Sequence, residues 1–475
     1  MKIYTRIKGM DISTLVEEEK CGARYFDDGE EGELIRILGK YGTNYVRIRL
    51  WNDPYGDRNP EETGSGEEPA GSGESSGRCR DEGYGSGSGE NCGISSDESC
   101  DSEIIEKREK YGAGTNDLDT AIILAKRAKA AGMKVLLDFH YSDFWADPGK
   151  QFPPKAWKDY GPEQLVKAVY EYTGSVLKTM RNNEVLPDMV QVGNELTNGC
   201  CWPLGRRDFV VGAEERAETG VVGAEERAEA SPSEVGKRDE TNMAEGEERE
   251  KAGQAASEAG REDKNTPYFN PVLRDIISAG LRAVREADPG IITMIHLDNG
   301  GNNGLYREWF DGYFGCGGDD FDVIGLSYYP FWHGNMAALK HNMDDIAMRY
   351  HKELVIAEVS MGFTTEDYSA YEGLDASQRK GMATKEHLLA GLDYPMSPEG
   401  QTEFMKHLNR IIDEVPERLG RGYFYWEPGW IPVPGCGWAT PASLEYIHDK
   451  GPCGNEWANQ ALFDFEGNAL PALKV

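Results

Sequence analysis

The 475-residue sequence predicts an α/β fold, a (β/α)8 TIM barrel built by a single domain over residues 1–475. Three observations predict it. Eight short apolar runs rich in β-branched residues recur along the chain, and segments with helical periodicity lie between them. No Gly-x-Gly-x-x-Gly motif follows the first run, which disfavours the alternative of a doubly wound open sheet. Eight strand–helix units close naturally into one barrel.

The predicted strands share a short apolar body and an abrupt change to polar residues where each strand ends. They are Ile7–Asp11, Tyr45–Leu50, Val135–Phe139, Met189–Val192, Ile291–His296, Val323–Ser327, Leu354–Glu358 and Tyr423–Trp426. In a barrel of parallel strands all of these carboxyl ends meet on one face.

The predicted helices place apolar residues at positions i, i+3, i+4 and i+7. They are Leu118–Ala131, Gln164–Met180, Val272–Ala287, Met336–Tyr350 and Glu403–Val415. Thr115 to Asp117 supplies a signal for the start of the first helix, and Gly132 follows its end. Pro289 and Gly290 stop the third helix.

Two low-complexity segments interrupt this alternation. Residues 57–112 are rich in Gly, Ser and acidic residues, and residues 213–264 are rich in Ala, Glu and Gly. The nonamer VVGAEERAE occurs at Val210–Glu218 and again at Val221–Glu229, which is too few copies for a repeat fold. Because such compositions bury little apolar surface, we interpret both segments as solvated insertions, the first of them flexible, on the carboxyl face of the barrel.

The charge balance excludes one class of protein. The chain has 51 basic and 83 acidic residues, a net charge of 51 − 83 = −32, which disfavours binding to nucleic acid. The sequence contains no run of about 18 apolar residues, so no membrane span is predicted. The first ten residues contain no apolar segment of the kind that marks a secretory signal.

The nine cysteines predict neither a zinc site nor a redox pair, because none forms a Cys-x-x-Cys motif. No metal site is predicted. A disulfide among Cys79, Cys92 and Cys100, or one between Cys436 and Cys453, stays open because sequence alone does not determine pairing.

Two glutamates at strand ends are candidate reacting groups. Glu195 follows the apolar strand Met189–Val192, and Glu358 ends the strand Leu354–Glu358. A carboxylate there faces a partner or a cleft, because burying it unpaired is costly. The fourth and seventh strands lie on opposite sides of the barrel, so the two carboxylates can face each other, as retaining glycoside hydrolysis requires. For either glutamate alone, an ion pair with Arg47 or Arg49 is the alternative.

Aromatic residues at the same ends indicate a carbohydrate ligand. Trp51, Trp145, Trp332 and Trp426 offer flat faces on which sugar rings stack, although any one of them alone could be core packing. Asn, Asp, His and Arg side chains nearby can bind hydroxyl groups. The sequence contains no phosphate-binding loop and no nucleophilic serine in an elbow motif.

Six long motifs resemble glycoside hydrolase family 53. They are RIRLWNDP at 47–54, LLDFHYSDFWADPGKQ at 136–151, QVGNELTNG at 191–199, IHLDNGGNN at 295–303, IGLSYYPFWHG at 324–334 and ANQALFDFEGNALPAL at 458–473. Members of this family are arabinogalactan endo-β-1,4-galactanases, retaining enzymes of clan A with a (β/α)8 catalytic domain. The motifs follow the family's order over most of the chain, although the two insertions have no usual counterpart.

The resemblance implies roles for the two glutamates. Glu195 would be the general acid/base and Glu358 the nucleophile, with Asn194 on the sugar 2-hydroxyl. Ser327 and Tyr329 point the same way by strand alternation, so Tyr329 is expected to hydrogen-bond the nucleophile. Further substrate-binding residues are expected at the mouth: Arg49 supporting the nucleophile, Asp138, His140 and Trp426 forming the wall of the sugar subsite, and Trp51, Trp145 and Trp332 as stacking surfaces.

The implied substrate is the β-1,4-galactan of pectin side chains, arabinogalactan type I. A monomer, an extracellular or periplasmic location and no required cofactor are expected. Some bacterial relatives carry calcium between the last two loops, but the Asp-x-Asp-x-His type of cluster is absent around Thr364–Asp375, so calcium is not predicted. Two alternatives stay open: another β-1,4-glycanase of clan A, a mannanase or glucanase, and a carbohydrate-binding barrel that does not hydrolyse its ligand.

Overall fold

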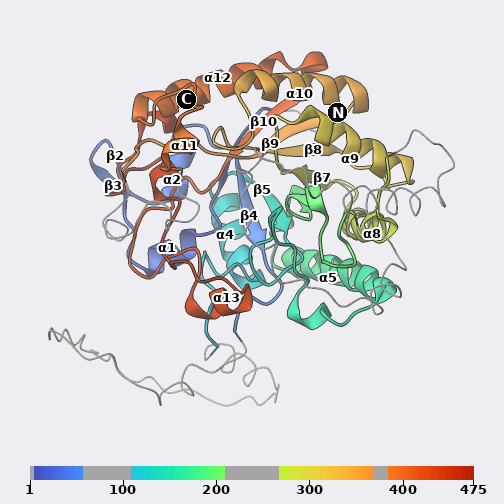
Figure 1. Ribbon diagram of the computed structural model, residues 1–475. Coiled ribbons are helices and arrows are strands. Elements are labelled where there is room, and N and C mark those ends of the chain that lie inside the picture. Colours follow the sequence, from blue (N-terminus) through green and yellow to red (C-terminus); the bar gives the residue numbers. More distant parts are fainter. Residues whose placement is uncertain (1–4, 57–107, 209–266, 367–382) are drawn as a thin grey trace, which may run out of the picture.

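The computed structural model describes residues 5–56, 108–208, 267–366 and 383–475. In this part of the chain eight parallel strands close into a barrel in the order β1-β4-β5-β6-β7-β8-β9-β10, and helices surround it (Figure 1). The first and last strands close the barrel, because Ile7 pairs with Gly422 and Met10 with Tyr425. The predicted (β/α)8 fold is confirmed.

All eight barrel strands were predicted, with bounds that differ by at most a few residues. They are β1 (Ile7–Asp11), β4 (Tyr45–Leu50), β5 (Lys134–Phe139), β6 (Met189–Val192), β7 (Ile292–Leu297), β8 (Val323–Tyr328), β9 (Glu353–Val359) and β10 (Gly420–Tyr425). A small antiparallel hairpin, β2 (Tyr25–Asp27) with β3 (Glu30–Gly32), lies outside the barrel.

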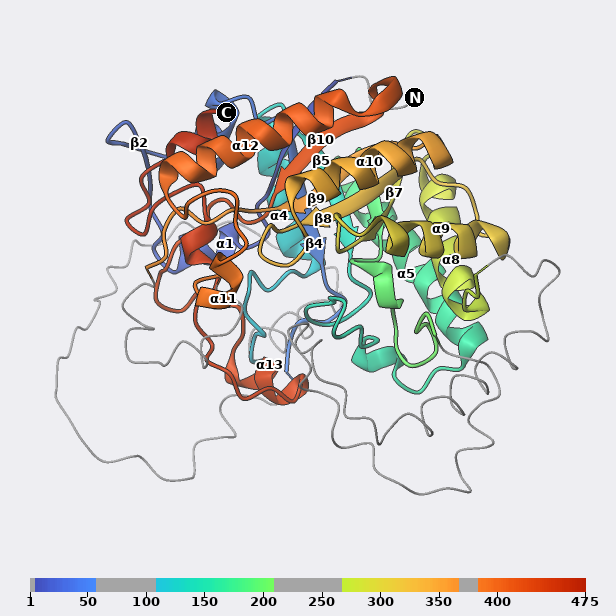
Figure 2. The ribbon, with the colours of Figure 1, turned by 45° about the horizontal axis from the view of Figure 1, so that its top comes forward.

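The helices that cover the barrel are α2 (Leu34–Lys40), α4 (Leu118–Ala130), α5 (Pro162–Asn182), α8 (Pro271–Ala287), α9 (Asn303–Gly315), α10 (Met336–Tyr350) and α12 (Pro398–Glu414). Shorter elements lie in the loops: α1 (Leu15–Lys20), α11 (Glu386–Leu389), α13 (Pro441–Tyr446) and 3-10 turns at Lys155–Trp157, Leu196–Asn198, Pro416–Arg418, Ala458–Gln460 and Pro471–Lys474. Figure 2 shows α10 and α12 over β9 and β10, which they contact.

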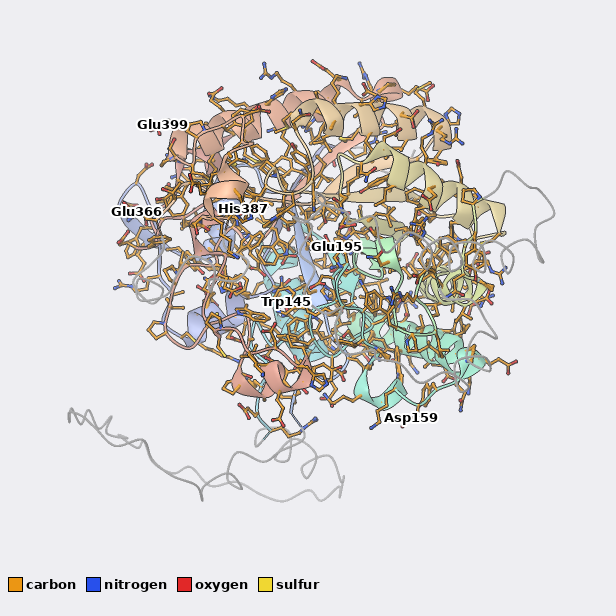
Figure 3. All side chains as sticks on the ribbon, in the orientation of Figure 1. Trp145, Asp159, Glu195, Glu366, His387 and Glu399 are labelled. Carbon is orange, nitrogen blue, oxygen red and sulfur yellow. The ribbon has the colours of Figure 1, made fainter. Side chains whose placement is uncertain are left out.

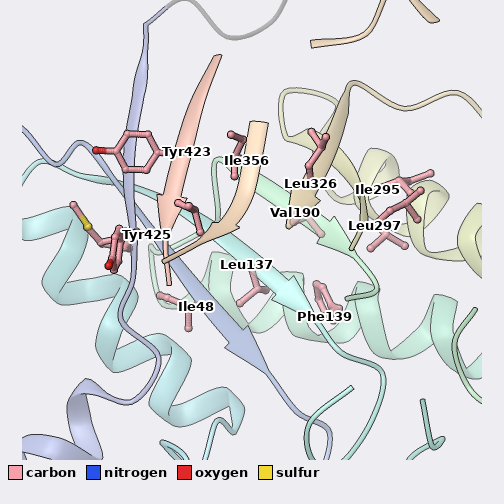
Figure 4. Close-up of a cluster of buried hydrophobic side chains, with 14 of the residues drawn as sticks. Ile48, Leu137, Phe139, Val190, Ile295, Leu297, Leu326, Ile356, Tyr423 and Tyr425 are labelled. Atoms are coloured by element: carbon pink, nitrogen blue, oxygen red, sulfur yellow. The ribbon is translucent and has the colours of Figure 1, made fainter. Parts of the chain in front are cut away.

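Strand alternation divides the core into two layers. One face of each strand packs against the helices, as Figure 4 shows for Ile48, Leu137 and Phe139. The other face fills the barrel interior with a separate cluster: Ile7, Tyr45, Leu136, Met189, Ile292, Met294, Val323, Val355, Ala357 and Phe424. Because this cluster plugs the lower interior, polar side chains further along the same faces can only lie at the carboxyl mouth.

One sequence expectation needs correction, and one open question is answered. The first insertion ends earlier than residue 112, because Tyr111 is 2% exposed and packs against Phe144 and Tyr446. The candidate disulfide between Cys436 and Cys453 is not formed; both are free cysteines. Cys79, Cys92, Cys100 and residues 213–264 lie outside the described residues. Within the described part of the chain, no helix is both long and apolar enough to cross a membrane.

Candidate active site

The carboxyl mouth of the barrel holds a layer of buried polar residues directly above the apolar plug. Arg47, Asp138, Gln191, His296 and Ser327 are each less than 1% exposed. Each stands two or four residues after a member of the interior cluster on its own strand, so the period of two in a strand directs it inward. The layer is therefore a direct consequence of the strand sequences.

Glu195 reaches the mouth through a turn that leaves the strand conformation. Gly193 has a φ of +83° and Glu195 a φ of +46°, so the chain stops being extended directly after β6. A side chain on Gly193 would lie 2.6 Å from Leu196, which explains the glycine. A left-handed conformation is unfavourable for glutamate, and residues held in it are concentrated at functional sites. Figure 3 shows Glu195 near the centre of the ring of helices, together with Trp145.

Glu358 faces the mouth because β9 is irregular. Leu326 pairs with Ile356 but the next residue of β8, Ser327, pairs with Glu358, so β9 contains one extra residue at this point. Simple alternation would place Glu358 on the outer face with Ile356. The bulge turns it inward, next to the inward-facing Ala357.

The two glutamates lie close together. A carboxylate oxygen of Glu195, a carboxylate oxygen of Glu358 and a ring nitrogen of His296 all lie within 4.8 Å of one another. Three such groups could in principle hold a metal ion. However, Arg47 occupies one oxygen of Glu358, and both ring nitrogens of His296 have protein partners. A cation would have to compete with these groups, so the arrangement suits a pair of reacting carboxyl groups better than a metal site.

Two donors hold Glu358. Arg47 Nη2 lies 2.9 Å from Oε1, and the Tyr329 hydroxyl donates to Oε2 at 2.8 Å. Burial raises the pKa of Glu358, and Arg47 and Tyr329 oppose that rise. The side chain thus has a cation and a hydroxyl donor that stabilise its ionised form.

Glu195 has a different environment. Burial, followed by the neighbouring carboxylates of Glu358 and Asp298, raises its pKa well above the usual value. No cation pairs with it among the described residues, and its one side-chain donor is the Ser327 hydroxyl, 2.6 Å from Oε1. The site therefore contains one carboxyl group that keeps its proton beside one that a cation helps to ionise.

Arg47, and not Arg49, is the cation beside Glu358. Arg47 Nη2 also bonds Asp138 Oδ2 at 2.8 Å and Asn194 Oδ1 at 2.9 Å, and its Nη1 bonds Asp11 at 2.9 Å. The expectation that Arg49 supports the nucleophile is wrong. Arg49 stands two residues further along β4 and pairs with Glu427 at 2.6 Å. Its guanidinium lies 4.4 Å from the centre of the Trp145 ring, so it supports that ring instead.

Asn194 is positioned by the same network. Its Oδ1 accepts from Arg47 and lies 3.0 Å from Gln191 Nε2, and its Nδ2 donates to the Ala146 carbonyl at 2.9 Å. One amide hydrogen of Nδ2 is left for a ligand, because an amide nitrogen carries two. The side chain is 4% exposed.

Three of the expected sugar-binding residues are buried supports. Trp51 is 0% exposed and donates to His140 Nδ1 at 3.2 Å, so it offers no face for stacking. His140 accepts a second bond from the Ala146 amide and directs its Nε2 to Asp138 at 3.0 Å. Asp138 in turn holds Arg47. In this structure these residues orient the cation and the loop after β5.

An aromatic cleft adjoins the glutamates. A cavity of about 280 Å³ is lined by Trp145, Trp426, Trp430, Trp438 and Trp457, with Asp147, Lys150, Asp449 and Glu456. Trp457 packs against Trp426 at 4.8 Å and against Tyr329 at 5.4 Å between ring centres, which joins the cleft to the Glu358 side of the site. Trp332, which is 37% exposed and lies in the loop after β8, extends this aromatic surface.

Sequence reasoning missed Trp438 and Trp457 as parts of the cleft. Both come from the segment after β10, outside any strand, so strand-end reasoning did not reach them. Their tryptophan side chains were the sequence signal from which both residues could have been recognised as parts of an aromatic cleft. A second cavity, of about 450 Å³, lies beside Arg206 and Arg207, but the acids there, Asp208 and Glu308, pair with these arginines. It therefore offers no free pair of carboxyl groups.

Comparisons with known proteins agree with this geometry. The family model of glycosyl hydrolase family 53 matches residues 7–79, 100–224 and 253–475. An uncharacterised protein of Niallia circulans is 33% identical, over 99% of this chain and 93% of its own length. The endo-β-1,4-galactanase of Bacillus subtilis is 30% identical, over 99% of this chain and 85% of its own length.

Solved structures resemble the chain over nearly its whole length. The family 53 catalytic domain from Ignisphaera aggregans has a TM-score of 0.68 at 30% identity, over 98% of this chain and 94% of that one. A fungal β-1,4-galactanase structure has a TM-score of 0.59 at 24% identity, which supports the fold. Fold, site geometry and sequence thus agree, and the chain belongs to glycosyl hydrolase family 53.

Proposed function

We propose that this chain is a retaining endo-β-1,4-galactanase that hydrolyses the β-1,4-galactan side chains of pectin. The observation that carries the proposal is the unlike pair of glutamates at the carboxyl mouth, with carboxylate oxygens within 4.8 Å of one another. Retaining hydrolases place their two carboxyl groups about 5–5.5 Å apart, whereas inverting enzymes need about 6.5–9.5 Å to admit a water molecule.

The environments of the two glutamates support a different role for each. Glu358, beside Arg47 and Tyr329, attacks the anomeric carbon as a carboxylate. Glu195, whose pKa is raised, donates its proton to the leaving oxygen. The glycosyl-enzyme ester removes the charge on Glu358, so Glu195 can then ionise and take a proton from the attacking water. Asn194 would bind the 2-hydroxyl group of the sugar with its second amide hydrogen, and the single protein acceptor of its Nδ2 supports this role.

The substrate follows from the aromatic cleft and from the relatives. Stacked indoles with a few carboxylates at the rim suit a neutral polysaccharide. The similarity to the Bacillus subtilis protein named endo-β-1,4-galactanase supports galactan, and not mannan or cellulose, as the substrate. The extracellular or periplasmic location, the monomeric state and the lack of a required cofactor remain parts of this proposal. The calcium question falls partly on residues 367–382, outside the described residues.

Hydrolysis of linear galactan tests the activity. We expect short galacto-oligosaccharides whose newly formed ends are initially β-anomers, measured as reducing ends and by NMR. Glu195→Gln and Glu358→Gln should each lower the rate by about 10³-fold or more, since each removes a reacting group. Glu353→Gln, a buried glutamate at the opposite end of β9, is the matched control. Faster hydrolysis of mannan or a cellulose derivative, or binding without hydrolysis, would refute the galactanase assignment.

Azide distinguishes the two glutamates. In Glu358→Ala, azide can occupy the place of the lost carboxylate and attack the substrate directly, giving an α-galactosyl azide. In Glu195→Ala, assayed with an activated aryl galactoside, azide attacks the glycosyl-enzyme and gives the β-galactosyl azide. The opposite pairing of products would exchange the two roles.

A further inference from the structure

His296, on β7, and Ser327, on β8, lie behind Glu195 and form a chain of hydrogen bonds with it. His296 Nε2 is 2.8 Å from Ser327 Oγ, and Ser327 Oγ is 2.6 Å from Glu195 Oε1. His296 and Ser327 are fully buried, so the chain is shielded from water. Neither residue had a role in the sequence-based assignment beyond its place at a strand end.

The tautomer of His296 follows from the partners of its other nitrogen. Nδ1 receives the Glu195 backbone N–H at 3.4 Å and the Gln191 amide at 3.0 Å. A backbone N–H can only donate, and the orientation of Gln191 is set by its bond to the Asp138 carboxylate at 2.7 Å. Asn194 Oδ1 also lies 3.0 Å from Nδ1, but it already accepts from Arg47, and the two amide hydrogens of Gln191 are directed to Asp138 and to Nδ1. Nδ1 is therefore the acceptor, and Nε2 carries the hydrogen.

This tautomer gives the chain of hydrogen bonds from His296 to Glu195 a single direction. His296 Nε2–H donates to Ser327 Oγ, so the single hydroxyl hydrogen of Ser327 is directed to Glu195 Oε1. An oxygen that already receives this hydrogen is a poor place for the proton of the acid. Burial and then Arg47 lower the pKa of His296 well below its usual value, so the ring stays neutral and the direction does not reverse with pH in the working range.

We propose that His296 and Ser327 are positioning residues that keep the acid proton of Glu195 on Oε2. The inference rests on the proposed function. Oε2 has no hydrogen-bond partner among the residues that the structure describes, so it is the oxygen free to meet the substrate. The same oxygen donates to the leaving group and later accepts from water, while Oε1 keeps the Ser327 donor in both steps. No bond to Ser327 or His296 forms or breaks.

Other charged and titratable groups also face Glu195, and the test must separate their effects. They are Glu358 on β9, Asp298 after β7, Asp147 in the loop after β5, Tyr329 after β8 and Tyr306 on α9. None of them bonds Oε1. A change confined to the Ser327 hydroxyl therefore leaves all of them in place.

Ser327→Ala tests the proposal through the pH dependence of kcat/KM on galactan. The Ser327 hydrogen bond stabilises the ionised form of Glu195, so its loss raises the pKa of Glu195. The basic limb should move up by about one pH unit, because a hydrogen bond to a charged group has roughly that strength. The acidic limb, which follows Glu358, should stay in place. The rate on galactan should fall about 10-fold or more, as the proton is shared between the two oxygens.

Two comparisons separate positioning from a general structural effect. An aryl β-galactoside with an activated leaving group needs no acid for its departure, so Ser327→Ala should retain its glycosylation rate within about twofold. Ser327→Thr, which keeps a hydroxyl, should restore the basic limb. The matched control is Ser360→Ala after β9, where a fully buried hydroxyl donates at 2.6 Å to Gln460. It should leave both limbs unchanged.

His296→Met tests the other member of this chain of hydrogen bonds. It should move the basic limb in the same direction, and the double variant with Ser327→Ala should add no further shift, since the two residues act through one bond. If Ser327→Ala does not fold, Ser327→Cys, which has a much weaker donor, should give the same shift. A basic limb that stays in place, an equal shift in Ser360→Ala, or an equal loss on the activated substrate would overturn the proposal. A wild type inactive on galactan would instead refute the proposed function.

Discussion

Single residues decide which side chains meet at the mouth of this barrel. Arg47 and Arg49 lie on the same face of β4, yet only Arg47 reaches Glu358, while Arg49 pairs with Glu427. The difference is their depth: Arg47 lies two residues closer to the apolar plug along β4, where its guanidinium bonds Asp138 and Asn194. Two chemically identical side chains therefore have different roles, one holding a carboxylate and the other supporting an indole.

Tyr329→Phe is a prediction at this scale. The Tyr329 hydroxyl donates to the ionised form of Glu358 and so lowers its pKa; without the donor the pKa rises. The acidic limb of kcat/KM, which marks ionisation of the nucleophile, should therefore move to higher pH. We expect kcat/KM to fall by about 10- to 100-fold, the value of a hydrogen bond to a charged group.

The neighbouring tyrosine provides the control. Tyr328 faces the helices, and its hydroxyl bonds the Gly334 carbonyl at 3.0 Å, away from the glutamates. Tyr328→Phe should keep the wild-type pH profile. An unmoved or lowered acidic limb in Tyr329→Phe would show that this hydroxyl does not stabilise the ionised nucleophile.

Helices with a strong apolar period were predicted well, whereas helix α9, which is rich in aromatic residues, was not. Helix α10 has the predicted bounds, Met336–Tyr350. Helix α9 was not predicted, because NGLYREWFDGYFG combines glycines and aromatic residues that have weak helix propensity. Its helical state comes from packing: Trp309, Phe310 and Tyr313 are 0% exposed and stack among the aromatic residues of this region. Tertiary contacts thus outweigh local preference in α9.

The residue that caps the start of α10 is expected to stabilise the fold. The Asn335 side chain accepts from the Ala338 amide at 2.9 Å and so caps the helix. Asn335→Ala should lower the free energy of unfolding by about 1 kcal/mol, because one amide at the helix start loses its partner. Asn335→Asp keeps the acceptor and should remain within a few tenths of the wild type. Denaturant unfolding at constant pH measures both, and equal stabilities of Ala and Asp variants would contradict the capping role.

In the connection between β4 and α4, bonds close to the barrel join the two ends of the first insertion. Gly56 N donates to the Glu109 carbonyl at 2.8 Å, Tyr111 N to the Pro54 carbonyl at 3.1 Å, and Arg108 pairs with Asp53 at 2.9 Å. These bonds tie the two ends of the first insertion to each other without the residues between them. The barrel is therefore expected to tolerate removal of the intervening chain.

Replacing residues 58–107 by a short Gly/Ser link tests this expectation. Shortening a loop reduces its closure entropy only slightly, about 0.6 kcal/mol for each halving, so the melting temperature should stay the same or rise by a few degrees. Hydrolysis of galactan should persist. The same deletion with Arg108→Ala should be less stable, because the pair with Asp53 is lost. Loss of folding in the simple deletion would show that the insertion contributes to the core.

The sequence by itself determined the number and order of the strands, the family and the positions of Glu195 and Glu358. Those features depend on local periodicity and on motifs that are contiguous in the chain. The tertiary structure decided which arginine meets Glu358, that Trp51 is buried, that Trp457 lines the cleft, and in which direction the hydrogen bonds run behind Glu195. These depend on the bulge in β9 and on contacts such as Arg47 with Asn194, 147 residues apart. Only closure of the barrel brings such residues together.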